Sequence, residues 1–266
     1  MLGLGANLAN ASTLVTAAAA FTDDYSVVLD GINDHVDLGS PFQSTFRGSW
    51  SASWWINFDD QTPSSHEFMF GAKTDANNHF YVGLLGSGGS AGNWFWYTKM
   101  NGVVGENTNV ASGFSGNSAS GWKHVVITTI NQGGTNKPIK KMYIDGSLIA
   151  TETSGSIDGD DQDAFVATQN IYVGAWNSEG SAGNYVTGKM NDVAIWSVAL
   201  DDDAVTAIYN SGSPTDLTTN SGNYDNSGNL VGYWKFEENT GTTASDSAGS
   251  SDGSLENGAS YDSDTP

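Results

Sequence analysis

The sequence predicts an all-β fold, a two-sheet antiparallel jelly-roll sandwich with one short helix near residues 201–210. Apolar and polar residues alternate along most of the chain from Tyr25 onward, which is typical of strands with one buried face. The 33 glycines and only 5 prolines indicate many tight turns between such strands. The 38% hydrophobic content, which includes 9 tryptophans, supplies a core, and the 266 residues fit one all-β domain or two smaller ones.

The clearest strand is expected at residues 50–58. Its core-facing positions are Trp50, Ala52, Trp54, Ile56 and Phe58, and its other, wetter face carries Ser51, Ser53, Trp55 and Asn57. The same alternation predicts further strands at residues 80–84, 94–96, 122–130, 171–175, 193–195 and 230–236.

Turn and cap residues place the remaining elements. Asp145-Gly146 joins the apolar runs 139–144 and 147–151, which is a hairpin signature because both turn residues tolerate positive φ. Asp201 caps the expected helix, and Asn210-Ser211-Gly212 ends it. The acidic run at 158–163 lacks the glycine of a calcium loop and is expected to be a solvated loop.

The net charge of the chain limits the classes of partner that it is expected to bind. With 9 Lys and Arg against 30 Asp and Glu, the formal charge is −21. Arg47 is the only arginine, so the chain lacks the basic face that nucleic acids require. An anionic membrane surface is disfavoured for the same reason, and no apolar run approaches the roughly 18 residues of a membrane span. With no cysteine, neither a disulfide nor a cysteine-based zinc site can form.

Residues 1–24 are interpreted as an N-terminal docking arm. The stretch is rich in alanine and mildly apolar, but it lacks the positive region that begins a signal peptide. A cleaved signal is the alternative to an arm that docks on another chain. The docking residues would be Leu2, Leu4, Leu8, Leu14 and Val15.

Specific strings resemble the laminin G-like, concanavalin A-like lectin/glucanase superfamily. They lie at residues 26–38, 53–56, 122–127, 142–146 and 188–196, in the family's order, and the resemblance covers residues 25–261 in outline. It implies the concanavalin A-like jelly roll, followed by a tail at 262–266.

The C-terminal segment departs from the family's order. Residues 230–258 resemble a segment that usually begins such a domain. Either the fold is circularly permuted, with residues 228–261 completing the sandwich, or a second domain is truncated. We favour permutation because about 40 residues cannot bury a core of their own.

No catalytic site is expected. Glucanases of this superfamily carry two glutamates on one strand, around an aspartate, and no string here matches that arrangement. The adjacent Glu237 and Glu238 point to opposite faces of a strand. The chain is therefore predicted not to be an enzyme.

Two kinds of binding site are expected. The resemblance implies a structural calcium ion, with Asp30 and Asp192 as ligands, and a hydrogen-bonded strand-end carboxylate is the alternative for Asp192. Sugar binding needs aromatic platforms beside amide and carboxylate groups. The candidates are Trp55, Trp176, Asn177, Glu179 and Asn184, although Trp55 could instead pack under a loop or against the partner sheet.

The first functional hypothesis is a non-enzymatic virion protein, a capsid decoration or fibre component of a marine-type bacteriophage. Lone phage-encoded members of the family resemble this acidic, cysteine-free chain with its short N-terminal arm. The arm would bind other virion proteins or copies of the chain, and the sandwich would display loops from the virion surface for adhesion to a host or its glycans. The alternative is an extracellular carbohydrate-binding or adhesion module of a secreted bacterial protein.

Overall fold

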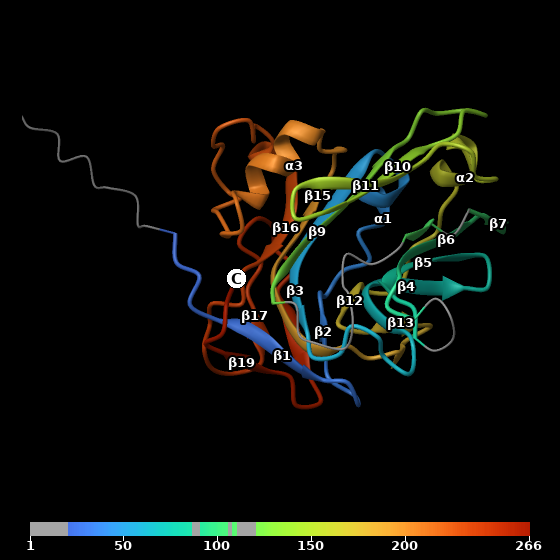
Figure 1. Ribbon diagram of the computed structural model, residues 1–266. Coiled ribbons are helices and arrows are strands. Elements are labelled where there is room, and N and C mark those ends of the chain that lie inside the picture. The colour runs from blue at the N-terminus through green and yellow to red at the C-terminus, as the bar shows by residue number, and fades with distance from the viewer. Residues whose placement is uncertain (1–20, 87–90, 106–107, 111–120) are drawn as a thin grey trace, which may run out of the picture.

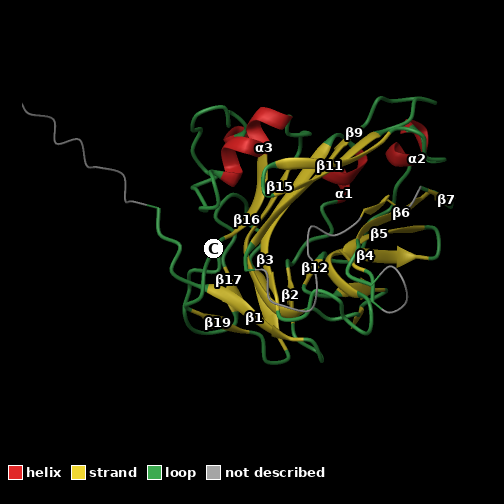
Figure 2. Cartoon of the chain, in the orientation of Figure 1, coloured by secondary structure: helices red, strands yellow, loops and turns green. Residues whose placement is uncertain are grey.

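The predicted all-β, two-sheet antiparallel fold is confirmed. The computed structural model describes residues 21–86, 91–105, 108–110 and 121–266, and Figures 1 and 2 show two sheets packed face to face. The predicted docking residues, Leu2 to Val15, lie outside the described residues. In the described part of the chain, no helix has both the length and the apolar character needed to cross a membrane.

Sheet A runs in the order β11-β10-β9-β3-β15-β1-β19, and β16 also pairs with β15. Its strands are β1 (Ser26–Asp30), β3 (Trp50–Phe58), β9 (Lys123–Ile130), β10 (Ile139–Ile144), β11 (Ser147–Glu152), β15 (Thr187–Trp196), β16 (Leu230–Trp234) and β19 (Ser260–Asp262).

Sheet B runs in the order β17-β18-β2-β12-β4-β5-β6-β7, with β13, β14 and β8 attached at its side. All its pairs are antiparallel except that of β13 with β4. Its strands are β2 (His35–Asp37), β4 (Glu67–Asp75), β5 (Asn78–Leu84), β6 (Trp94–Met100), β7 (Val103–Val104), β8 (Thr108–Val110), β12 (Tyr172–Val173), β13 (Trp176–Ser178), β14 (Ser181–Gly183), β17 (Thr243–Ala244) and β18 (Gly253–Glu256).

The C-terminal segment takes part in both sheets. In sheet A, β16 pairs with β15 and β19 pairs with β1. In sheet B, β18 pairs with β2. The segment therefore shares the core of the sandwich, although circular permutation itself stays a prediction.

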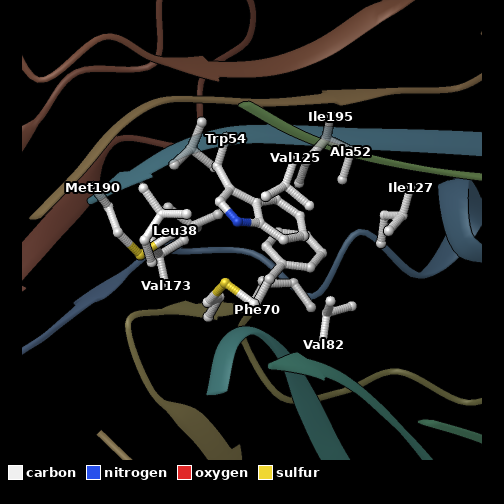
Figure 3. Close-up of a cluster of buried hydrophobic side chains, with 14 of the residues drawn as sticks. Leu38, Ala52, Trp54, Phe70, Val82, Val125, Ile127, Val173, Met190 and Ile195 are labelled. Atoms are coloured by element: carbon white, nitrogen blue, oxygen red, sulfur yellow. The ribbon is translucent and has the colours of Figure 1, made fainter. Parts of the chain in front are cut away.

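The core lies between the two sheets, where the alternating pattern places it. All the predicted core positions of β3 are buried. Trp54 of sheet A stacks on Phe70 of sheet B, with ring centroids 5.4 Å apart and an interplanar angle of 15° (Figure 3). Aromatic pairs of this kind stabilise the contact between the two sheets, both through the apolar area that they bury and through their ring geometry.

A second apolar cluster covers the outer face of sheet A. Helix α3 (Asp202–Tyr209) lies against β15 and β16 (Figure 1), and its Ala204, Val205 and Ile208 pack on Trp196 and Tyr233 of those strands. The predicted helix is confirmed, and its cap is Asp201, whose carboxylate accepts the Ala204 N–H at 2.8 Å.

The expectation of a wetter second face on β3 is wrong. Ser51 and Ser53 are fully buried and Trp55 is 3% exposed. The reason is the covering helix: the Trp55 ring stacks on Tyr209 of α3 at 5.9 Å. Alternation separates the two faces of a strand, but here both faces are covered by other parts of the chain.

The described part of the chain contains three further short helices. They are α1 (Gln43–Arg47), α2 (Gly159–Asp163) and the 3₁₀ helix η2 (Ser227–Asn229). The acidic run expected to be a loop contains α2, since Asp158 and Asp161 form a reciprocal capping box at its start. Each carboxylate accepts the other residue's backbone N–H, which stabilises even a single turn.

Candidate functional site

The outer face of sheet B carries a continuous set of aromatic rings, here called the aromatic strip. Its residues occupy the positions of β4, β5, β6 and β13 that point away from the core, together with one residue just before β4. Neighbouring positions such as Phe80 and Trp96 point into the core instead. The members are His66, Phe68, His79, Tyr81, Phe95, Tyr97 and Trp176.

Tyr81 lies at the centre of the aromatic strip. Its ring stacks on Phe68 at 4.6 Å and on Tyr97 at 5.1 Å, and Trp176 meets it edge-on at 5.0 Å. His79 continues the stack on Tyr97 at 5.3 Å and 11°. The rings therefore hold one another in fixed orientations.

The aromatic strip has a buried floor and a half-exposed top. Phe68 and Phe95 are buried, whereas His79, Tyr81, Tyr97 and Trp176 are half-buried. Burial lowers the pKa of His79 and raises the pKa of Tyr81 to about 12, so both rings are uncharged at neutral pH. The centre of the strip, at His79 and Tyr81, thus presents uncharged aromatic surface to solvent.

Charged groups border this surface beside Trp176. The Lys73 ammonium lies 5.9 Å from the centre of the Trp176 ring and 2.7 Å from a carboxylate oxygen of Glu179. Glu179 occupies the turn between β13 and β14 with a positive φ of 55° and is exposed. Trp176 and Glu179, both predicted glycan residues, therefore lie at one place on the surface.

Asn177, another predicted glycan residue, supports the hairpin from within. It is 2% exposed. Its amide nitrogen donates to the Asn170 carbonyl at 2.9 Å, and its amide oxygen accepts the Gly180 N–H at 2.8 Å. Both ends of the side chain are engaged with the backbone, so Asn177 positions the turn and offers no group to a ligand.

An open groove of about 510 Å³ adjoins one end of the aromatic strip. Three loops that are distant in sequence form it, and His66 belongs to both features, since its ring lies 5.9 Å from Phe95. The predicted Asn184 lines this groove and donates to the His66 carbonyl at 3.2 Å. The lining residues are Gly31, Asp60, Pro63, Ser64, Ser65, His66, Glu67, Asn184, Tyr185 and Thr187.

Trp55 does not contribute an exposed platform, because α3 covers it. Its ring packs between His124, at 4.7 Å, and Tyr209. This face is opposite to the aromatic strip, on the other sheet. Trp55 is therefore part of the structural cluster under α3.

The two predicted calcium ligands do not fit one site. Asp30 pairs with Thr187 across the sheet, and Asp192 lies five residues further along β15, roughly 16 Å away at strand spacing. The Asp30 Oδ1 accepts the backbone N–H groups of Ile32 and Asn33, which are donors and not cations. No group of three acidic or histidine side chains able to hold a metal occurs among the described residues.

Asp192 is instead a hydrogen-bonded residue of a strand bulge. It has a positive φ of 47° at the irregularity between β15 and β3 and is 3% exposed. The Tyr233 hydroxyl donates to its Oδ1 at 2.5 Å. Burial raises the pKa of Asp192 well above its usual value.

The sequence analysis missed most of the aromatic strip. His79, Tyr81 and Tyr97 alternate with the core residues that identified these strands, so the strand pattern already carried the signal. A row of aromatic side chains at outward positions of adjacent strands is the feature that could have revealed the surface.

Comparison with solved structures supports the fold. A Bacteroides ovatus protein described as a candidate carbohydrate-binding protein superposes with a TM-score of 0.60 at 18% identity, over 91% of this chain and 60% of that chain. The CBM40 of Ruminococcus gnavus IT-sialidase gives a TM-score of 0.51 at 13% identity, over 68% of this chain and 96% of that one. NanB sialidase from Streptococcus pneumoniae gives 0.54 at 19% identity, over 74% of this chain and 29% of that one.

These similarities to solved structures concern the fold alone, and the chain spans less than two thirds of the length of the Bacteroides and Streptococcus proteins. No curated protein matches the sequence. The family described as the concanavalin A-like lectin/glucanases superfamily matches residues 30–206, which is more than half of the chain. The chain therefore belongs to the concanavalin A-like lectin/glucanase superfamily.

Proposed function

We propose that this chain is a non-catalytic carbohydrate-binding domain that holds a glycan on the aromatic strip. The observation that carries the proposal is the half-exposed stack of His79, Tyr81 and Tyr97 with Trp176 beside it. Sugar rings present apolar C–H faces, and aromatic faces bind them while nearby polar groups fix their orientation.

The groups around the aromatic strip supply that polar orientation. Glu179 and Lys73 lie beside Trp176 and offer an acceptor and donors to sugar hydroxyls. The structural similarity to the Bacteroides ovatus protein and to CBM40 adds support, since the first is described as carbohydrate-binding and the second belongs to a sialidase. The family's paired catalytic glutamates have no counterpart in the sequence, which supports binding without hydrolysis.

Glycan-array screening followed by calorimetry of the best hit tests the proposal. We expect Trp176→Ala to weaken binding by about tenfold or more, because one aromatic wall of the site is removed. Trp122→Ala is the matched control, since Trp122 is also half-buried but lies immediately before β9, a strand of the other sheet. Equal affinity in wild type and Trp176→Ala, or the absence of any glycan ligand, would contradict the proposal.

A more specific prediction is that this domain is part of a virion structural protein. It rests on the N-terminal arm at residues 1–24, most of which lies outside the described residues. Its test is recovery of the chain in purified particles and loss of that recovery when residues 1–24 are deleted. A secreted module that binds glycans would be recovered outside particles in both forms.

A further inference from the structure

The groove next to the aromatic strip contains a buried carboxyl group with an unused oxygen. Glu67, at the start of β4, is 6% exposed and lines the groove. Its Oε2 has no hydrogen-bond partner among the residues that the structure describes. A buried polar atom without a partner is energetically unfavourable, so this oxygen favours any ligand that brings a matching group.

The surrounding structure fixes this carboxyl in place. The backbone N–H and the side-chain hydroxyl of Thr187 both interact with it. Gly31 packs so tightly on Thr187 that a Cβ there would lie 1.9 Å from the threonine hydroxyl oxygen. Glu67 is therefore held by β15 and by the loop after β1, and its free oxygen cannot simply rotate into solvent.

The other groove residues offer hydrogen bonds without positive charge. The His66 Nδ1 lies 2.9 Å from the Gly86 N–H and accepts from it, so the ring proton is on Nε2, which serves as a donor. Ser64 and Ser65 are exposed and add hydroxyl groups. No lysine or arginine is among the described residues that line the groove, whereas Asp60 adds a second acidic side chain.

From this geometry we infer that the groove is a subsite for one uncharged sugar unit, with Glu67 as its specificity-determining residue. A hydroxyl group both donates and accepts, so it satisfies Glu67 Oε2 whether the carboxyl is protonated or ionised. An acidic sugar meets the Asp60 carboxylate and the Glu67 carboxyl, and no cation among the described lining residues, which disfavours it. The volume of about 510 Å³ lies within the usual range for ligand sites and exceeds what a single water molecule needs.

The inference rests on the proposed function, because His66 joins the groove to the aromatic strip and one glycan would span both. A glycan array that pairs neutral oligosaccharides with their sialylated counterparts tests it on the full chain. We expect binding to the neutral forms. The best neutral hit is then titrated into three variants: Glu67→Gln, Glu67→Met and Ser64→Tyr.

The three variants separate the effect of the polar atoms of Glu67 from the effect of the shape of the groove. Glu67→Gln keeps polar atoms at both positions, so its affinity should stay within about threefold of wild type. Glu67→Met removes them at similar volume and should weaken binding by about tenfold or more. Ser64→Tyr obstructs the groove from an exposed position that makes no core contact, and it should weaken binding to a similar extent even if Glu67→Met folds poorly.

The results distinguish this inference from the proposed function. If Trp176→Ala abolishes binding while Ser64→Tyr and Glu67→Met bind as wild type does, the groove is not a subsite and the aromatic strip still is. A preference for sialylated forms would overturn the inference. Stabilisation by calcium ions that disappears in Glu67→Gln would also overturn it, since the groove would then be a cation site. If no glycan binds, both proposals fail.

Discussion

The two outer faces of the sandwich carry similar aromatic side chains and use them differently. On sheet A, Trp55 stacks under Tyr209 of α3 and is 3% exposed. On sheet B, Tyr81 and Trp176 meet at 5.0 Å and remain half-exposed. Residue type alone therefore does not identify a binding platform. An aromatic ring can act as a binding platform only where no other part of the chain covers it.

The covered face contributes to stability, and the open face is left available for binding. On sheet A, residues of α3 and of the segment that follows it form a second apolar cluster with the strands. On sheet B, the rings of the aromatic strip pack mainly on one another. The comparison predicts that a substitution on the covered face mainly lowers stability, whereas an equivalent substitution on the open face mainly lowers glycan affinity.

The largest stability effect is expected at Trp55. Trp55→Ala should lower the free energy of unfolding by about 3–5 kcal/mol, because it opens a cavity between β3 and α3. Trp176→Ala should cost about 2 kcal/mol or less, since that ring is already half in solvent. Urea denaturation of both variants measures the difference. Equal losses would show that the two faces are packed alike.

The next effect is a pH dependence at the open face, from Glu67. Burial raises the pKa of Glu67 from 4.5 to about 8, and the negative charges of Asp59 and Asp60 act in the same direction. Above pH 4.5 the unfolded chain loses this proton while the folded chain keeps it, so stability falls as pH rises towards 8. At 1.36 kcal/mol per pH unit, the loss between pH 4.5 and pH 7 is about 3 kcal/mol.

Glu67→Gln isolates that contribution, because it cannot ionise and keeps the bonds to Thr187. The difference in unfolding free energy between variant and wild type should grow steadily from pH 4.5 to pH 8 in favour of the variant. Other carboxyls whose pKa is raised, such as Asp23 with a pKa of about 6, titrate in both proteins. Their contributions therefore cancel in the difference. A difference that does not change with pH would mean that Glu67 is solvated in the folded chain.

The sequence predicted the parts of the fold that depend on local patterns. Alternation identified the core face of β3, and the Asp145-Gly146 turn has the positive φ angles, 50° and 72°, that its residues allow. The Asp201 cap was also local, since the cap and its partner Ala204 are three residues apart. Each of these features is determined within a few residues of chain.

The candidate site depends on contacts that no local pattern records. The groove joins Gly31, Glu67 and Asn184, which lie in three segments distant in sequence. Trp55 was a candidate platform because its own strand does not show that α3 will cover it, although the apolar side of that helix required a partner. Sequence reasoning therefore found Trp176, Glu179 and Asn184 from their loops but could not separate them from Trp55.

A smaller effect is expected at the start of α3. Asp201→Ala should lower the free energy of unfolding by about 1 kcal/mol, because the Ala204 N–H loses its acceptor. Glycan affinity should not change, since α3 lies on the covered face. Thermal denaturation and calorimetry of the same sample measure both quantities. A loss of affinity without a loss of stability would place the binding surface on sheet A.

Two exposed ion pairs, one on each face, give the smallest and most closely matched comparison. Lys141 and Asp202 are 2.7 Å apart on the covered face, and Lys73 and Glu179 are 2.7 Å apart on the open face. Asp202 also accepts the Tyr143 hydroxyl at 2.6 Å. Hydrogen bonds from Lys141 and Tyr143 lower the pKa of Asp202, so its charged form is stabilised there.

Asp202→Asn should therefore cost about 1 kcal/mol, because it weakens a charged hydrogen bond and the favourable charge at the N-terminus of α3. Glu179→Gln removes only a surface pair and should change stability by less than about 0.5 kcal/mol. Urea denaturation at low and at high salt measures both, and salt should reduce the Glu179 effect towards zero. A larger stability loss at Glu179 than at Asp202 would mean that the β13–β14 turn is a structural support of sheet B, and the division between a stabilising face and a binding face would then fail.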